Sequence, residues 1–319
     1  MFFSLLAYSF VKNSIMVFYR KLRIITMPIL GLIAITTILF SCGSDTKDDQ
    51  IENKISNSID SNASTLVKFD NTLFSMPSPY EIAFLVKRAN LTYNKNMLNP
   101  YNKSHNYVTN FDKALNMGIY GSDLGYLTLY EQNSDAIQYF SVVKILSQEL
   151  NIENAFDKKT VNRIESNIGN KDSLMYIVST SYRKADQYLK DNNRNDIGVL
   201  VLAGGWIEST YMLTQLAKQA NKPEILTRIA EQKHPLDNLI KLLSPYYNTS
   251  KEYAELTDQL IDLAYDFDGI DVSYTYAPPT TDEKNKLTII NSKSQVNFTD
   301  QQLKTITEKI EKIRNNIVK

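Results

Sequence analysis

The chain of 319 residues carries 35 basic and 35 acidic side chains, so its formal charge at pH 7 is zero. This balance argues against a nucleic-acid partner, because phosphate binding needs clustered lysine and arginine. The single cysteine excludes an intramolecular disulfide framework and a cysteine-rich metal site.

Residues 1–41 have the layout of a signal peptide. A cationic cluster between Arg20 and Arg23 precedes "MPILGLIAITTILFS", an apolar run of 15 residues from Met27 to Ser41. A spanning helix needs about 20 residues, whereas a cationic segment before a shorter apolar run is typical of a secretory signal. Residues 1–15, "MFFSLLAYSFVKNSI", form a second apolar stretch before this signal, which is unusual. The true start of translation is therefore placed at Met16 or Met27. Met16 is preferred because it keeps the cationic cluster.

The residues that end this run, Leu39-Phe40-Ser41-Cys42, resemble the lipobox of bacterial lipoproteins. The resemblance implies that the Cys42 thiol receives a diacylglyceryl group, that the signal is cut before Cys42, and that the new amino group is acylated. Each buried methylene contributes about 0.8 kcal/mol, so two or three acyl chains of palmitate type anchor a protein stably. The alternative is a lone buried cysteine at the end of an ordinary apolar element.

The residues after Cys42 refine the expected location. Gly43 replaces the aspartate of inner-membrane retention signals, and Lys47-Asp48-Asp49 resembles the export tag of surface lipoproteins in the Bacteroidota. The expectation is a lipid anchor in the outer membrane, with exposure at the cell surface.

Removal of residues 1–41 leaves 31 basic and 35 acidic side chains, a net charge of −4. Residues 42–65 are then the lipidated cysteine and a polar segment too poor in apolar groups to order itself. This segment is expected to be a flexible tether with a root-mean-square span of about 25 Å.

Residues 66–319 are predicted to form a single helical domain, an irregular all-α array of about nine to ten helices. Helical spacing of apolar residues and capping signals indicate the individual helices. About two helices are expected in residues 106–132, with a break near Gly118 or Gly121, and Pro235 is expected to kink or split residues 223–243. Other helices are predicted at residues 77–90, from Ser134 to about 152, 157–168, 172–191, 195–220 and 250–267.

The pattern changes near the C-terminus. Residues 269–298 alternate or are rich in β-branched side chains, which predicts a short β-hairpin. Thr299 and Gln302 then form a capping box. The last helix carries an apolar stripe of Leu303, Ile306, Ile310, Ile313 and Ile317.

Two glycine-bearing segments are the candidate site. Ile197–Ile207 is apolar on every side and contains Gly204-Gly205, which indicates a buried helix that another helix approaches closely. Gly121 and Gly125 would share one face of a second helix and allow tight packing. The competing hypothesis is a ligand pocket lined by Tyr120, Asp123, Tyr126, Trp206 and Glu208.

No other motif predicts a catalytic residue, a cofactor or a metal. Asp266, Asp268 and Asp271 surround Gly269, but the EF-hand order is not met. His105 and His234 make neither a zinc site nor an obvious catalytic base.

The segments "GIYGSDLGYLTLYEQ" and "LAGGWIEST" are similar to segments of uncharacterised all-helical lipoproteins of the Bacteroidota. This resemblance covers most of residues 70–319 and implies no activity. The leading hypothesis is a non-catalytic binding or accessory module, whose partners are the membrane and an unknown ligand or envelope protein. The alternatives are a hydrolase that uses Asp123 and Glu208, and a structural envelope protein that binds a neighbour.

Overall fold

The computed structural model describes residues 66–69, 72–75, 90–155, 158–168, 170, 173, 188–220, 222–282 and 286–319. All of them belong to one compact unit, Glu52–Lys319. The leader, Cys42, the tether, the helix expected at 77–90 and most of the helix expected at 172–191 lie outside the described residues.

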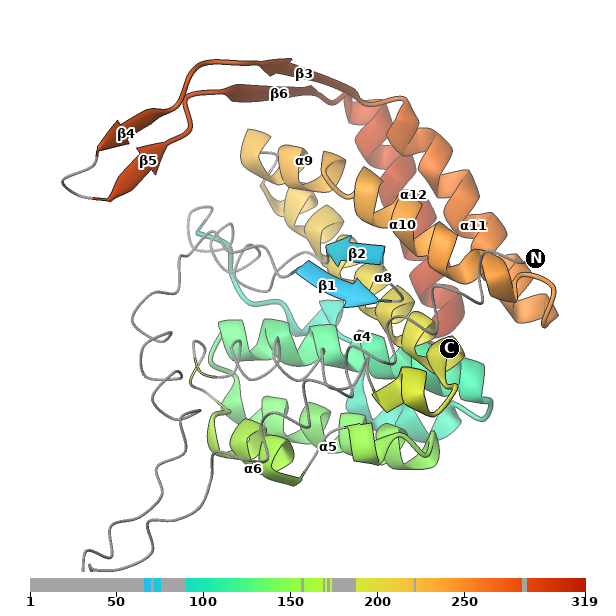
Figure 1. Cartoon of the computed structure of the whole chain (residues 1–319). Helices are drawn as coiled ribbons and strands as arrows, with labels where there is room; N and C mark the ends of the chain where they lie inside the picture. Colours follow the sequence, from blue (N-terminus) through green and yellow to red (C-terminus); the bar gives the residue numbers. More distant parts are fainter. Residues whose placement is uncertain are drawn as a thin grey trace, which may run out of the picture. The chain divides into compact units, whose positions relative to one another are not determined.

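The described residues are mostly helical with a few short strands, which confirms the predicted all-α class with a hairpin near the C-terminus (Figure 1). The first elements are β1 (Leu66–Phe69), β2 (Thr72–Ser75), η1 (Lys95–Met97), η2 (Tyr101–Asn106), α4 (Asn110–Leu129), α5 (Asn133–Glu149), η3 (Glu153–Ala155), α6 (Lys158–Ser166) and α8 (Asn195–Gln219). The remainder are α9 (Pro223–Ala230), α10 (Lys233–Leu243), η4 (Ser244–Tyr246), α11 (Lys251–Asp268), β3 (Asp271–Thr275), β4 (Thr280–Asp282), β5 (Leu287–Ile289), β6 (Lys293–Asn297) and α12 (Asp300–Ile317).

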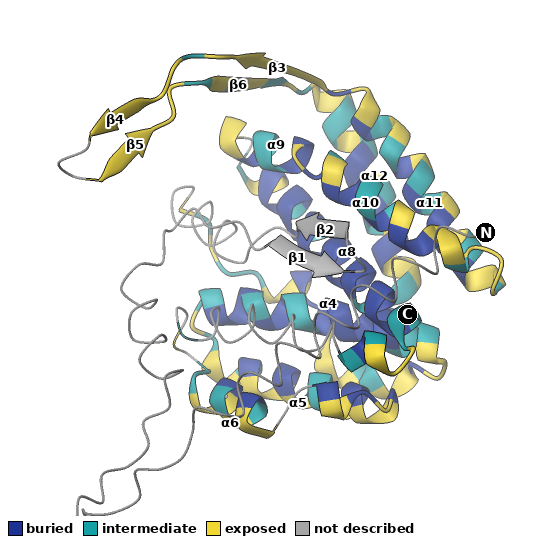
Figure 2. Ribbon diagram, in the orientation of Figure 1, coloured by how far each residue is buried: buried dark blue, intermediate teal, exposed yellow. Residues whose placement is uncertain are grey.

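Helix α8 is the buried centre of the array, as its apolar sequence predicts (Figure 2). It is long and apolar enough to cross a membrane, but 89% of its most apolar window is buried inside the protein. Its neighbours include α4, α9, α10 and α12. The apolar residues of α8 therefore serve the core of the domain.

Helix α4 runs without interruption from Asn110 to Leu129, so the expectation of two helices with a break near Gly118 or Gly121 is wrong. The Thr109 side chain caps it by accepting a hydrogen bond from the Asp112 N–H at 3.0 Å. Each interior glycine costs about 1 kcal/mol relative to alanine. Packing of α4 against α8 and α5 outweighs that cost.

The α4–α8 contact is a close approach of two backbones at Gly118 and Gly204. A Cβ on Gly118 would lie 2.1 Å from the Val201 carbonyl oxygen, and a Cβ on Gly204 would lie 1.9 Å from that of Leu115. A Cβ on Gly121 would meet nothing within 4 Å. The close-packing role expected of Gly121 is therefore wrong, and Gly118 fills it.

The helix boundaries differ from expectation in two places. Helix α5 begins at Asn133, so Ser134 lies inside the helix and is not its cap. The break between α9 and α10 falls at Glu231-Gln232, and Pro235 lies in the first turn of α10. Proline is tolerated there because its missing N–H would have no partner within the helix.

The chain between α11 and α12 forms a long hairpin. β3 pairs antiparallel with β6, and further out β4 pairs antiparallel with β5. Helix α12 then begins with the predicted capping box of Thr299 and Gln302. The pair β1–β2, which the sequence did not predict, is a separate two-stranded sheet.

Candidate functional site

Three charged side chains from α4, α8 and α12 meet inside the helical array. Asp123 and Glu208 have no exposed surface, and Arg314 is 7% exposed. Arg314 donates from Nε to Glu208 Oε2 at 3.0 Å and from Nη2 to Glu208 Oε1 at 3.1 Å. This bidentate pair is the strongest form of an arginine–carboxylate contact.

The Arg314 guanidinium has two further contacts. Nη2 donates to the Met97 carbonyl oxygen at 3.1 Å, and the guanidinium carbon lies 4.8 Å from the centre of the Tyr211 ring. The surrounding groups thus replace the water that the cation loses on burial.

Asp123 and Glu208 form a carboxyl–carboxyl pair. Burial raises the pKa of Asp123 well above its usual range, and the neighbouring charge of Glu208 adds to the rise. Burial also raises the pKa of Glu208, whereas Arg314 opposes that rise. Burial and the neighbouring carboxyl group therefore favour the protonated form of Asp123, whereas Arg314 favours the negative charge on Glu208.

A proton on Asp123 also completes the hydrogen bonding. Two ionised carboxylates only accept, so Asp123 Oδ1 would be buried without a partner among the described residues. Protonated Asp123 donates to Glu208, which is the side-chain hydrogen bond that links the two groups. Its other oxygen, Oδ2, accepts from the Asn99 N–H at 3.1 Å.

Asn99 extends the cluster toward the C-terminus of the chain. Its Nδ2 donates to the Tyr107 hydroxyl at 2.9 Å and to Asn116 Oδ1 at 3.2 Å. Asn116 Nδ2 in turn donates to the Ile317 carbonyl oxygen at 3.1 Å. The polar cluster therefore joins the segment around η1 to α4, α8 and the end of α12.

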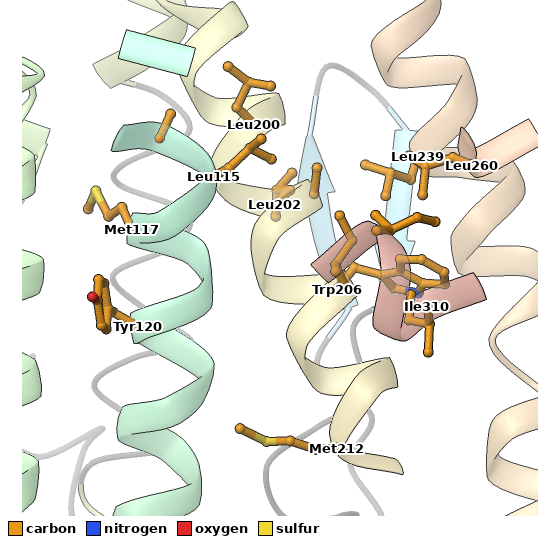
Figure 3. Close-up of a cluster of buried hydrophobic side chains, with 14 of the residues drawn as sticks. Leu115, Met117, Tyr120, Leu200, Leu202, Trp206, Met212, Leu239, Leu260 and Ile310 are labelled. Atoms are coloured by element: carbon orange, nitrogen blue, oxygen red, sulfur yellow. The ribbon is translucent and has the colours of Figure 1, made fainter. Parts of the chain in front are cut away.

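Of the five residues predicted to line a pocket, the structure brings Asp123 and Glu208 together, and the hydroxyls of Tyr120 and Tyr126 have other hydrogen-bond partners. Tyr120 and Trp206 point to opposite sides of the α4–α8 pair (Figure 3). The Tyr120 hydroxyl donates to the Pro100 carbonyl oxygen at 3.0 Å, and the Tyr126 hydroxyl accepts from the Asn94 N–H at 3.0 Å. All five side chains are buried.

Trp206 is part of the apolar core. Its fully buried indole lies near Ile310, with Leu239 and Leu260 close by (Figure 3). Its Nε1 has no hydrogen-bond partner among the described residues. The indole therefore has an apolar environment rather than the open edge of a stacking wall.

Within the described part of the chain, no group of three histidine, cysteine, aspartate or glutamate side chains is placed to hold a metal ion. Asp266 forms an ion pair with Lys309 at 2.6 Å, and Asp268 forms one with Lys233 at 2.8 Å. Asp266 and Asp268, at the end of α11, thus face lysines, whereas Asp271 Oδ2 accepts from Asn297 Nδ2 at 2.8 Å.

Models of protein families, curated proteins and solved structures were compared with the chain, and none of the three comparisons finds a match.

Sequence reasoning missed Arg314, Asn99 and Asn116. The signal for Arg314 was present, because it stands four residues after Ile310 and three before Ile317, on the apolar stripe of α12. A charged residue on such a stripe needs a buried partner. No comparable periodicity marks Asn99, which lies in a loop before η2.

Proposed function

We propose that this chain is a lipid-anchored envelope protein of the Bacteroidota that acts as a non-catalytic binding or accessory module at the outer membrane. The lipobox-like residues that end at Cys42 support the lipid anchor. The Lys47-Asp48-Asp49 tag supports the location at the outer membrane. A helical domain that follows a polar tether fits a module held near the bilayer.

The observation that carries the non-catalytic part is the burial of Asp123 and Glu208. A general acid or base must come within hydrogen-bond distance of its substrate. Both carboxyl groups are fully buried, and Arg314 occupies both oxygens of Glu208. The cluster is thus a structural contact between α4, α8 and α12.

Cell fractionation tests the anchor. The full chain and its Cys42→Ser variant are produced in a bacterium that processes lipoproteins, and the N-terminal peptide from membranes is analysed by mass spectrometry. The expected result is an acylated peptide that begins at Cys42, and loss of membrane association in the variant. An unmodified thiol still joined to residues 1–41 would contradict the proposal.

A screen tests the binding role. The melting temperature of the purified protein is measured with glycans, peptides and metal ions, and a ligand of the module is expected to raise it, because binding to the folded state stabilises it. If no compound changes the melting temperature, the hypothesis of a small-molecule ligand is excluded. The structural alternative, in which the protein binds an envelope neighbour, is then favoured. Cross-linking in intact membranes followed by co-purification would identify that neighbour.

The second candidate is a carboxylate-dependent hydrolase. The contact between protonated Asp123 and ionised Glu208 favours it, because acid–base catalysis uses two carboxyl groups in different protonation states. Aryl glycosides and aryl esters are suitable probe substrates. Hydrolysis by the wild type that is lost in both Asp123→Asn and Glu208→Gln would replace the non-catalytic proposal.

A further inference from the structure

The hairpin between α11 and α12, called the arm here (residues 271–282 and 286–297), gathers exposed apolar side chains. Of the twelve large hydrophobic residues exposed in the described part of the chain, six lie on the arm. Their exposed fractions run from 49% to 77%, and Figure 2 shows the exposure along all four strands. These residues are Val272, Tyr274, Tyr276, Leu287, Ile289 and Ile290.

The strand register separates the proximal half of the arm into an apolar face and a polar face. Val272 pairs with Val296 and Tyr274 with Ser294, so Val272, Val296 and Tyr274 share one face. The residues of the opposite face are Asp271, Ser273, Thr275, Lys293, Gln295 and Asn297. This alternation is that of a strand pair with one face covered and one in water.

Among the described residues, it is the base of the arm that the rest of the protein covers. Val296 and Phe298 pack against the core, and β6 lies beside α9. Further out, Tyr276 is 69% exposed and Ile290 is 77% exposed. A two-stranded hairpin is marginally stable in water on its own, so a covering surface would stabilise the distal half.

A second copy of the chain is a poor cover for this face. The apolar strip is about 30 Å long and about 10 Å wide, which gives two copies roughly 600 Å² of buried area, against the roughly 1,200 Å² of a stable specific interface. Edge-to-edge pairing along β3 and β4 is interrupted by Pro278 and Pro279, which have no N–H to donate.

Neither the small area of the strip nor the prolines on its edge prevents contact with a lipid surface, because a bilayer needs no complementary shape and no strand edge. The arm has exposed apolar side chains with tyrosine among them, and balanced charges from Asp271, Asp282, Lys286 and Lys293. The face opposite Val272 and Tyr274 is polar, whereas in the distal half Leu287 pairs with Asp282 and Ile289 with Thr280. Tyrosine is enriched at membrane–water interfaces, where its ring is buried and its hydroxyl stays wet. The balanced charge indicates insertion that does not depend on anionic headgroups.

We propose that the arm is a second membrane contact, in which Tyr276, Leu287, Ile289 and Ile290 enter the interfacial layer of the bilayer. The proposal rests on the proposed function, since the lipid on Cys42 and residues 43–65 would keep the domain within roughly 25 Å of the bilayer. The tether ends in sequence at Leu66, where β1 begins, so the arm is a separate segment of the chain.

The test separates the arm from the lipid anchor. A chain from residue 42 with Cys42→Ser keeps the whole compact unit Glu52–Lys319 but has no acyl group. Its co-sedimentation with phosphatidylcholine vesicles is compared with that of the triple variant Tyr276→Ser, Ile289→Ser and Ile290→Ser. We expect the partition coefficient of the triple variant to fall by at least about tenfold. Addition of phosphatidylglycerol is expected to change little.

The chain offers a matched control outside the arm. Val108, Ile137 and Ile145 are 79%, 52% and 47% exposed, and their replacement by serine removes comparable apolar surface. The control is expected to keep wild-type vesicle binding, and unchanged urea midpoints would show that both triple variants remain folded.

A nitroxide label gives a second readout. On vesicle addition, a label at Ile290→Cys is expected to become more accessible to oxygen than to a water-soluble nickel complex, whereas a label at Ile137→Cys is not. No vesicle binding, equal loss in both triple variants, or self-association that depends on the arm would each overturn the proposal. Lipidation of Cys42 is measured separately, so its failure would leave these results interpretable.

Discussion

Arg314 and Glu208, 106 residues apart in the sequence, form a bidentate ion pair that joins the last helix of the domain to its central helix. The pair is almost wholly removed from water, with side chains 8% and 0% exposed. A buried pair of this kind gives modest net stability when complete, but loss of one partner leaves an uncompensated charge in the core.

The first prediction concerns Arg314→Met. Glu208 would then be buried without its counter-ion, and the free energy of unfolding is expected to fall by about 3–5 kcal/mol. Urea denaturation measures the loss. The control is Arg228→Met, which breaks a solvent-exposed ion pair with Glu231 and is expected to cost less than about 1 kcal/mol. Equal losses in the two variants would contradict the structural role of the buried pair.

The second prediction is a pH dependence that originates at Asp123. Its unfolded pKa is near 3.8 and its folded pKa is raised by burial. Between these two values the folded protein binds more protons than the unfolded chain, so the free energy of unfolding falls as pH rises. Asp123→Asn keeps a carbonyl for the Asn99 N–H and an N–H for Glu208, but its side chain does not titrate. It is therefore expected to reduce the change of the free energy of unfolding with pH.

Melting temperatures from about pH 5 to about pH 9 measure the effect. Asp135→Asn, which removes a carboxylate from an exposed pair with Lys95, is the control and is expected to keep the wild-type slope. A slope that is the same in all three proteins would show that Asp123 is not the group that titrates.

The third prediction separates two glycines of α4. Gly118→Ala would place a Cβ 2.1 Å from the Val201 carbonyl oxygen, so α4 and α8 must move apart, at a cost of about 3 kcal/mol or more. Gly121→Ala meets nothing within 4 Å and is expected to stabilise the protein by about 0.5–1 kcal/mol through helix propensity. Chemical denaturation of both variants distinguishes packing from propensity, and effects of the same sign would be inconsistent with the contact.

The fourth prediction concerns the start of α12. Thr299→Ala removes the side-chain acceptor of the Gln302 N–H and is expected to cost about 1 kcal/mol. Thr305→Ala, inside the same helix, is expected to be neutral or slightly stabilising because alanine is the better helix former. A thermal unfolding comparison in which Thr299→Ala leaves stability unchanged would show that α12 does not depend on its capping box.

Local signals predicted much of the fold. The capping box of Thr299 and Gln302 and the apolar stripe through Ile310 were sufficient for α12, because each acts within one helix. The alternating residues before Thr299 predicted the hairpin for the same reason. The apolar stretch Ile197–Ile207 also predicted that α8 would be the buried central helix.

The errors arose where partners distant in sequence decide the outcome. Whether a glycine breaks a helix or permits contact depends on the helix opposite, so Gly121 was assigned the role of Gly118. The structure brings the side chains of Asp123 and Glu208 together, and Arg314, which the sequence analysis did not single out, pairs with Glu208. Because Arg314 donates to both oxygens of Glu208, these groups form a buried polar contact between three helices.

The position of Trp206, the only tryptophan of the chain, gives the protein a built-in optical reporter. Its indole is fully buried and its Nε1 has no hydrogen-bond partner among the described residues, so its emission should be shifted to short wavelength in the native state. Because the arm contains no tryptophan, intrinsic fluorescence will follow the opening of the core and remain silent to events at the hairpin tip.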